Sequence, residues 1–160
     1  MNGSPTCSQS AVFDGIAADV VEQLCYKGRQ RSLEAGHRLF DRDEDAVDLM
    51  ILQEGTVDLV FPLHVLNVTR EVAMDRLQPG DVVAWSALVH PYRFTLSAIC
   101  ATRCVLTALS RSTLEDFFET DPQTGHRFMR NLAGVIGRRL QKMQMMWMHD
   151  LQTSAAKPMS

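Results

Sequence analysis

The residues best suited to bind a ligand lie in one short stretch, residues 80–98, with the sequence GDVVAWSALVHPYRFTLSA. A short helix beginning near Ala84 would present free backbone N–H groups at its first turn, and such groups favour an anion. Arg93, returned toward that turn by the loop through Pro91, would add a planar guanidinium suited to phosphate or carboxylate, and Ser86 would add a hydroxyl. The stretch therefore predicts an anion-binding site. The sequence is also compatible with an Arg93 that is ion-paired at the surface.

The sequence contains none of the common catalytic motifs that we considered. The sequence lacks a glycine-rich phosphate loop, a Rossmann fingerprint and a His-Glu-x-x-His motif. Neither Ser86 nor Ser97 lies in a nucleophile elbow, and the predicted strands lack the His and carboxylate cluster of a cupin-like metal site. We therefore predict no catalytic residues, no metal site and no enzymatic activity. His90, beside the candidate stretch, is open to two interpretations: a haem ligand or an ordinary loop histidine.

Charge is nearly balanced over the 160 residues, with 16 basic and 19 acidic side chains and a net charge of −3. This balance gives no reason to expect a general affinity for nucleic acid. Between residues 126 and 150, however, the only acid is Asp150, against the cations Arg127, Arg130, Arg138, Arg139 and Lys142. Such a run is typical either of an anion-facing helix or of a solvated helix face.

The four cysteines, at positions 7, 25, 100 and 104, lack the two-residue spacing common in zinc and iron–sulfur sites. We expect small buried side chains, with Cys100 and Cys104 on one face if a single strand carries both. The first ten residues lack the basic start and apolar core of a signal peptide. The uncharged stretch over residues 82–92 is too short to cross a bilayer. The sequence therefore predicts a soluble cytoplasmic protein with reduced thiols and no membrane contact.

Hydrophobic periodicity divides the chain into helical ends and a β-rich middle. Apolar residues recur at helical spacing over residues 13–26. Eight short runs then have the composition of strands, separated by turn residues: 31–33, 37–40, 48–53, 56–61, 71–77, 81–84, 95–100 and 102–109. Many short strands at regular spacing favour an antiparallel sandwich or barrel.

The pattern after residue 109 is helical again. Ser110 and Ser112 are candidate caps for a short helix that ends at Asp121 and Pro122. A long helix is predicted over residues 123–151, with the apolar stripe Phe128, Leu132, Ile136, Leu140, Met143, Trp147 and Leu151. A stripe of this length would be half exposed on a small barrel, so we expect it to pack on the same helix of a second copy. Gly134 and Gly137 within it predict either close backbone approach or a kink.

Three short motifs resemble those of cyclic-nucleotide-binding-like domains, the sensor domains of catabolite-activator and FNR-type regulators, kinase regulatory subunits and gated channels. Residues 36–40 (GHRLF) resemble the family's G-x-x-[IL]-F strand, and residues 50–57 (MILQEGTV) its I-x-x-G-x-[VI] hairpin. Residues 77–82 (LQPGDV) resemble its L-x-x-G-[DE]-x-[FV] turn. The resemblance covers residues 13–151. It implies a mainly β fold, a jelly-roll β-barrel of about eight strands with flanking helices, and a long C-terminal dimerisation helix.

The same resemblance implies where a ligand would bind. Residues 84–95 are similar to the family's phosphate cassette, and the implied ligand-binding residues are Ala84, Trp85, Ser86, Ala87, Arg93, Phe94 and Thr95. Trp85 stands where the family has a glutamate that accepts hydrogen bonds from the ribose 2′-hydroxyl. An indole offers a donor and no acceptor, so an ordinary cyclic nucleotide would lose about 1–3 kcal/mol there. We therefore expect a different small anion, and a cyclic nucleotide is the alternative ligand.

The predicted organisation is a loose tail (residues 1–10), a β domain with flanking helices (11–121), the long helix (122–152) and a second tail (153–160). The predicted function is that of a stand-alone sensor domain that binds a small anionic ligand and signals through its C-terminal helix to a partner protein. The alternative is a ligand-free dimerisation module whose cassette is filled by Trp85. No helix-turn-helix reader is expected in the short tail, so we do not expect direct DNA binding.

Overall fold

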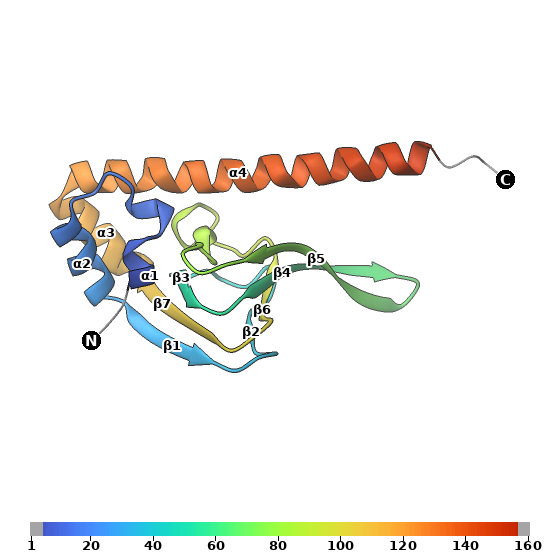
Figure 1. The fold of residues 1–160 in the computed structure, drawn as a ribbon, viewed down its shortest axis with the longest axis horizontal. Coiled ribbons are helices and arrows are strands. Elements are labelled where there is room, and N and C mark those ends of the chain that lie inside the picture. Colours follow the sequence, from blue (N-terminus) through green and yellow to red (C-terminus); the bar gives the residue numbers. More distant parts are fainter. Residues whose placement is uncertain (1–4, 157–160) are drawn as a thin grey trace.

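The structure, a computed structural model, describes residues 5–156, and it places a single long helix across two β-sheets (Figure 1). Two short helices and an N-terminal segment lie at one end of the sheets, and a β-hairpin extends from the other end beneath the far half of the long helix (Figure 1). In chain order the elements are α1 (Pro5–Ser8), η1 (Ala11–Phe13), α2 (Ala18–Tyr26), β1 (Arg29–Leu33), β2 (Arg38–Phe40), β3 (Asp48–Glu54), β4 (Val57–Val65), β5 (Val68–Leu77), η2 (Trp85–Leu88), β6 (Ser97–Cys100), β7 (Cys104–Ser110), α3 (Arg111–Thr120) and α4 (Pro122–Ala155).

The described strands form a three-stranded sheet in the order β1-β7-β3 and a four-stranded sheet in the order β2-β6-β4-β5, with every pair antiparallel. The predicted mainly β fold with flanking helices is confirmed. The predicted closed barrel is not, because the two sheets remain separate. Residues 81–84, predicted as an eighth strand, pair with β3 only through a bridge between Val82 and Ile51. The chain then turns into η2, so that a longer ladder cannot form.

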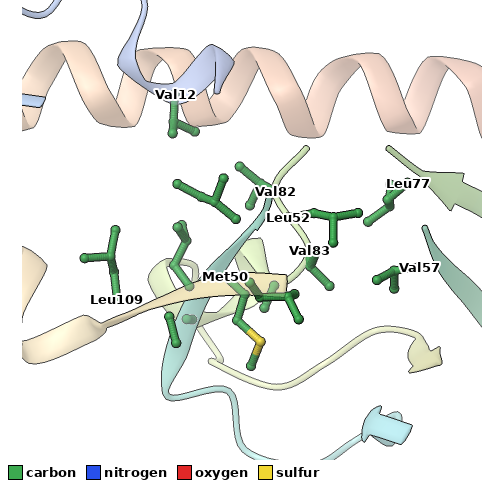
Figure 2. Close-up of a cluster of buried hydrophobic side chains, with 14 of the residues drawn as sticks. Val12, Met50, Leu52, Val57, Leu77, Val82, Val83 and Leu109 are labelled. Carbon is green, nitrogen blue, oxygen red and sulfur yellow. The ribbon is translucent and has the colours of Figure 1, made fainter. Parts of the chain in front are cut away.

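One hydrophobic core joins the two sheets to the helices. Leu49, Ile51 and Leu106 from the first sheet and Val57 from the second are fully buried. Figure 2 shows part of this core, with Met50 and Leu52 beside Val57, Leu77, Val82, Val83 and Leu109, and with Val12 above them. The turn between β3 and β4 depends on Gly55, which has a φ of +87°, and a Cβ there would collide with the carbonyl oxygen of Arg103.

The hairpin formed by β4 and β5 is longer than the sequence predicted. The two strands pair as far as Val65 and Val68, and the turn is made by Leu66 and Asn67, both with positive φ. The predicted strand ends at residue 61, before Pro62. Strand β6 pairs with β4 only as far as Val60, so one side of β4 has no strand partner at Pro62 and a proline is accommodated there.

The N-terminal region differs from the single helix predicted over residues 13–26. It is divided into η1 and α2, and Gly15 between them has a φ of +75°, which interrupts any helix. Cys7 and Ser10, expected to be part of a loose tail, are packed, since both are 1% exposed. Residues 1–4 lie outside the described residues. At the other end α4 continues to Ala155, into the segment predicted as the second tail, of which residues 157–160 are also outside the described part.

Two of the four cysteines form a disulfide, which corrects the expectation of reduced thiols throughout. Cys7 in α1 and Cys25 in α2 are bonded, with Cα atoms 6.3 Å apart. Contact between the two short helices brings them together across 18 positions of sequence, which spacing alone does not predict. Cys100 and Cys104 are free and buried as predicted, although they belong to different strands, β6 and β7.

The first turns of α4 are fixed to the rest of the protein. Phe128 and Leu132 are fully buried, and the Phe128 ring contacts the rings of Phe13 and Phe118 at centroid distances of 5.7 and 5.1 Å. The Asn131 amide donates to the carbonyl oxygens of Val12 and Asp14 at 2.9 and 2.8 Å. The helix begins after Asp121, whose carboxylate accepts from the Thr124 amide, and it runs unbroken past Gly134 and Gly137.

Leu132→Ala should lower the free energy of unfolding by about 2–5 kcal/mol, because it leaves a cavity beneath α4. The control is Met129→Ala on the same helix, where the side chain is 37% exposed and the expected loss is below about 1 kcal/mol. Urea unfolding followed by circular dichroism measures both. Equal losses would contradict the proposed anchoring of α4 through its buried face.

The buried thiols should be chemically inert. Burial, aided by a hydrogen bond with Cys104, raises the pKa of the Cys100 thiol to about 12, so that almost none of it is thiolate at mildly alkaline pH. We expect iodoacetamide to leave Cys100 and Cys104 unmodified in the folded protein and to modify both in urea, as measured by mass spectrometry. Rapid modification without denaturant would contradict the burial described above.

Candidate functional site

A pocket of about 540 Å³ lies between the β4–β5 hairpin and α4, and we call it the hairpin–α4 pocket. Its floor comes from the hairpin, one wall from Trp85 and the segment Thr95–Leu96, and its roof from α4. The lining is mostly apolar: Leu59, Phe61, Leu63, Val72, Met74, Trp85, Thr95, Leu96, Ile136, Leu140, Met143 and Trp147, with Asp75 and Arg139. Its volume is in the range of small-molecule binding sites.

Regular geometry explains why these side chains meet. Leu59, Phe61 and Leu63 are two residues apart on β4 and therefore project from one face of the strand. Ile136, Leu140, Met143 and Trp147 are three or four residues apart on α4 and share one side of the helix. The stripe predicted as a dimer seam therefore also forms the roof of this pocket.

The pocket has one cationic side chain in its lining, Arg139, and one acidic side chain, Asp75. The Arg139 guanidinium donates through Nη2 to the carbonyl oxygen of Val82, while Nη1 is buried without a hydrogen-bond partner among the described residues. Burial lowers the pKa of Arg139, and the carboxylates of Asp81 and Asp75 oppose that shift. Because a guanidinium does not deprotonate in proteins, Arg139 is a partly desolvated cation. Asp75 is paired with Lys142 at 2.5 Å.

Of the seven residues predicted to bind a ligand, the structure brings two into this pocket, Trp85 and Thr95. Ala84, Ser86 and Ala87 are buried beside it and do not line it. The predicted short helix is the single four-residue turn η2. Its amides at Ala87 and Val89 donate to the backbone carbonyls of Ala84 and Ser86.

Arg93 lies away from the pocket. Its Nη1 donates to the carbonyl oxygen of Asp43 at 2.7 Å, and its Nη2 is 3.6 Å from the carboxylate of Asp45. Its side chain is 58% exposed, which is the ion-paired surface arrangement that the sequence left open. Phe94, the next residue, is buried and stacks on Phe40 with ring centroids 3.6 Å apart.

The sequence analysis did not assign the hairpin residues or Arg139 to a site. The hairpin residues Phe61, Leu63 and Met74 belong to strands predicted only in part. Arg139 was one of five cations on the long helix, and sequence carries no signal that separates it from its neighbour Arg138. What distinguishes the two is the orientation of α4 on the core, which leaves Arg138 exposed and Arg139 half-buried, with its Nη1 atom fully buried.

Two further features are absent from residues 5–156. No group of three or more His, Cys, Asp or Glu side chains is placed to hold a metal ion. None of the described helices is sufficiently long and apolar to pass through a lipid bilayer.

A family model for the cyclic nucleotide-binding domain matches residues 30–121, more than half of the chain. The chain belongs to the cyclic nucleotide-binding domain family. The matched residues include all seven strands but for the first residue of β1, together with η2 and α3, and the hairpin–α4 pocket is formed by this domain and the helix that follows it. A search of curated proteins finds no significant match.

Several solved structures have a fold similar to that of this chain. The catabolite activator protein of Thermus thermophilus superposes with a TM-score of 0.72 at 24% identity, covering 90% of this chain and 63% of that one. A c-di-GMP-responsive global regulator of Xanthomonas campestris gives 0.71 at 18% identity, covering 81% and 62%. The N-terminal domain of a transcriptional regulator from Streptomyces coelicolor gives 0.70 at 20% identity, covering 89% and 94%. These similarities show a shared fold.

The apolar lining should make the pocket visible to a fluorescent probe. We expect 1-anilinonaphthalene-8-sulfonate to bind the folded protein with increased fluorescence, because the dye pairs an apolar ring system with one anionic group. Ile136→Trp, which fills the pocket, should lower that signal at least several-fold. Met129→Trp on the exposed part of the same helix is the matched control and should leave the signal unchanged; equal signals in the two variants would contradict binding in this pocket.

Proposed function

We propose that this chain is a regulatory domain that binds a small ligand in the hairpin–α4 pocket and transmits occupancy through α4, as a homodimer. The observation that supports this most directly is the composition of the pocket. Its walls come from the sheet and its roof from the part of α4 that follows the buried anchor at Leu132. A ligand there would contact both and would bias how the far half of α4 packs.

The lining favours an anionic ligand with an apolar body over an ordinary cyclic nucleotide. Arg139 is the cation in reach, and most other lining atoms are aliphatic or aromatic. Trp85 offers no acceptor for a ribose hydroxyl where the family has a glutamate. Arg93, which the family resemblance would assign to the ligand phosphate, is bonded to Asp43 and Asp45. The Xanthomonas regulator, described as c-di-GMP-responsive, supports the idea that ligands vary on this fold.

The exposed apolar residues of α4 support a homodimer. Leu140, Trp147 and Leu151 repeat at intervals of seven and four on one side of the helix and are 56%, 61% and 70% exposed. An apolar row of this kind is stabilised by packing on another helix, most simply the same row of a second copy. Gly137 has open space around its Cα, which would let a partner backbone approach.

A ligand-free dimerisation module is the second candidate. Two observations favour it. Trp85 lines the pocket in place of the glutamate that would bind the ribose, and Arg93, expected to bind the phosphate, is paired with Asp45 instead. This candidate shares the homodimer and differs only in having no ligand. We assign no enzymatic role to either candidate.

Dimerisation is tested by sedimentation velocity. We expect the native chain to sediment as a dimer and Leu151→Asp, which adds a charge to the α4 row without touching the pocket lining, to sediment as a monomer. Met129→Asp places the same charge on the first half of α4 and should remain dimeric. A monomeric native chain would rule out both candidates in their present form.

Ligand binding is tested by thermal unfolding in the presence of cyclic nucleotides, cyclic dinucleotides and organic acids. A ligand present at one hundred times its Kd should stabilise the protein by about 2.7 kcal/mol. That shift should persist in Arg93→Ala and disappear in Ile136→Trp. A cyclic nucleotide shift gained in Trp85→Glu would explain why the native chain lacks it. No shift with any compound in a dimeric protein would favour the ligand-free module, and loss of the shift in Arg93→Ala would place the ligand at the cassette.

A further inference from the structure

A second cavity, of about 220 Å³, shares Arg139 and Asp75 with the lining of the hairpin–α4 pocket, and we call it the Ser10 cavity. It is formed by residues 10–11, the end of β5 at residues 75–77, the turn at residues 80–82, and α4 side chains around Arg138 and Arg139. Its size is below that of a site for a nucleotide and suits a ligand of only a few atoms.

Two residues that line this cavity each carry a buried polar atom without a partner among the described residues. These atoms are the hydroxyl oxygen of Ser10 and Nη1 of Arg139. The backbone of Ser10 is already satisfied, because its amide donates to Cys7 and its carbonyl accepts from Phe13. The Ser10 hydroxyl is therefore left to donate to a ligand. Ser10 as a whole is only 1% exposed. Such unpaired buried groups are uncommon and costly unless something else binds them.

Two of the cationic side chains that line the cavity have no ion-pair partner among the described residues. Arg76 makes two bonds to the Asp58 carboxylate, and Lys142 is paired with Asp75. The remaining acid, Asp81, accepts from the backbone amide of Gln78 at 2.8 Å. Within residues 5–156, Arg138 and Arg139 have no carboxylate within ion-pairing distance.

We propose that the Ser10 cavity binds a small oxyanion, with the guanidinium groups of Arg138 and Arg139 and the hydroxyl of Ser10 as its donors. An oxyanion offers several charged acceptors for these donors, and two guanidinium groups match the several oxygens of a phosphate or the two oxygens of a carboxylate. A neutral ligand would leave the buried charge of Arg139 uncompensated. This site is separate from the proposed ligand pocket, although Arg139 borders both.

Thermal unfolding at constant ionic strength tests the proposal, with sodium phosphate, sulfate or acetate replacing sodium chloride. Phosphate at about ten times its Kd should raise Tm by about 3 °C relative to chloride. A shift with phosphate and sulfate alone would identify a tetrahedral anion, and an equal shift with acetate would identify a carboxylate. Equal Tm values in all four salts would overturn the site.

Two variants locate the anion. Arg138→Gln should weaken phosphate binding by about tenfold, while Arg130→Gln, the same change at an exposed arginine on α4 outside the cavity, should leave the Kd unchanged. Ser10→Ala should raise Tm in chloride, because it removes an unsatisfied buried hydroxyl, and should shrink the phosphate shift. A Ser10→Ala protein that is less stable in chloride, or a full phosphate shift in Arg138→Gln, would overturn the proposal.

Discussion

Burial of one face of α4 on the core is the contact on which the functional features depend. Phe128 and Leu132 are fully buried, and Asn131 ties the same turns to the segment around Val12. Further along, the helix has only the hairpin beneath it, and the ion pair between Lys142 and Asp75 joins the two at one point (Figure 1). The first turns of the helix are therefore fixed on the core, and its later turns have fewer contacts. The hairpin–α4 pocket lies where the helix leaves the core.

The order of elements was predictable because each depends on local periodicity. The strands around Leu49 and Leu106 bury alternate or consecutive apolar residues, and the helix from Pro122 buries residues at intervals of three and four, so composition alone indicated both. The structure differs from the prediction where a single residue or a contact distant in sequence determines the local structure. A positive φ at Gly15 divides the first helix, and the Cys7–Cys25 disulfide requires a tertiary contact that no local pattern encodes.

The site was predictable only in part, because side-chain direction is a tertiary property. Trp85 and Thr95 reach the pocket, since η2 and the segment before β6 form its wall. Arg93 is directed elsewhere by Asp43 and Asp45, about fifty residues earlier in the chain, whose approach the sequence does not show. Arg139, by contrast, faces the core, where it donates to the carbonyl oxygen of Val82. The rotation of α4 about its axis determines which of its several cations does so.

The unsupported end of α4 has a mechanical consequence. From Gly137 to Ala155 the helix extends by roughly 27 Å at 1.5 Å per residue. A tilt of about 10° about the anchored turns would displace the tip by roughly 5 Å, the rise of about one helical turn. In the proposed function, this segment would act as a lever arm, because a small change in packing against Ile136 would become a movement of this size at the tip of the helix.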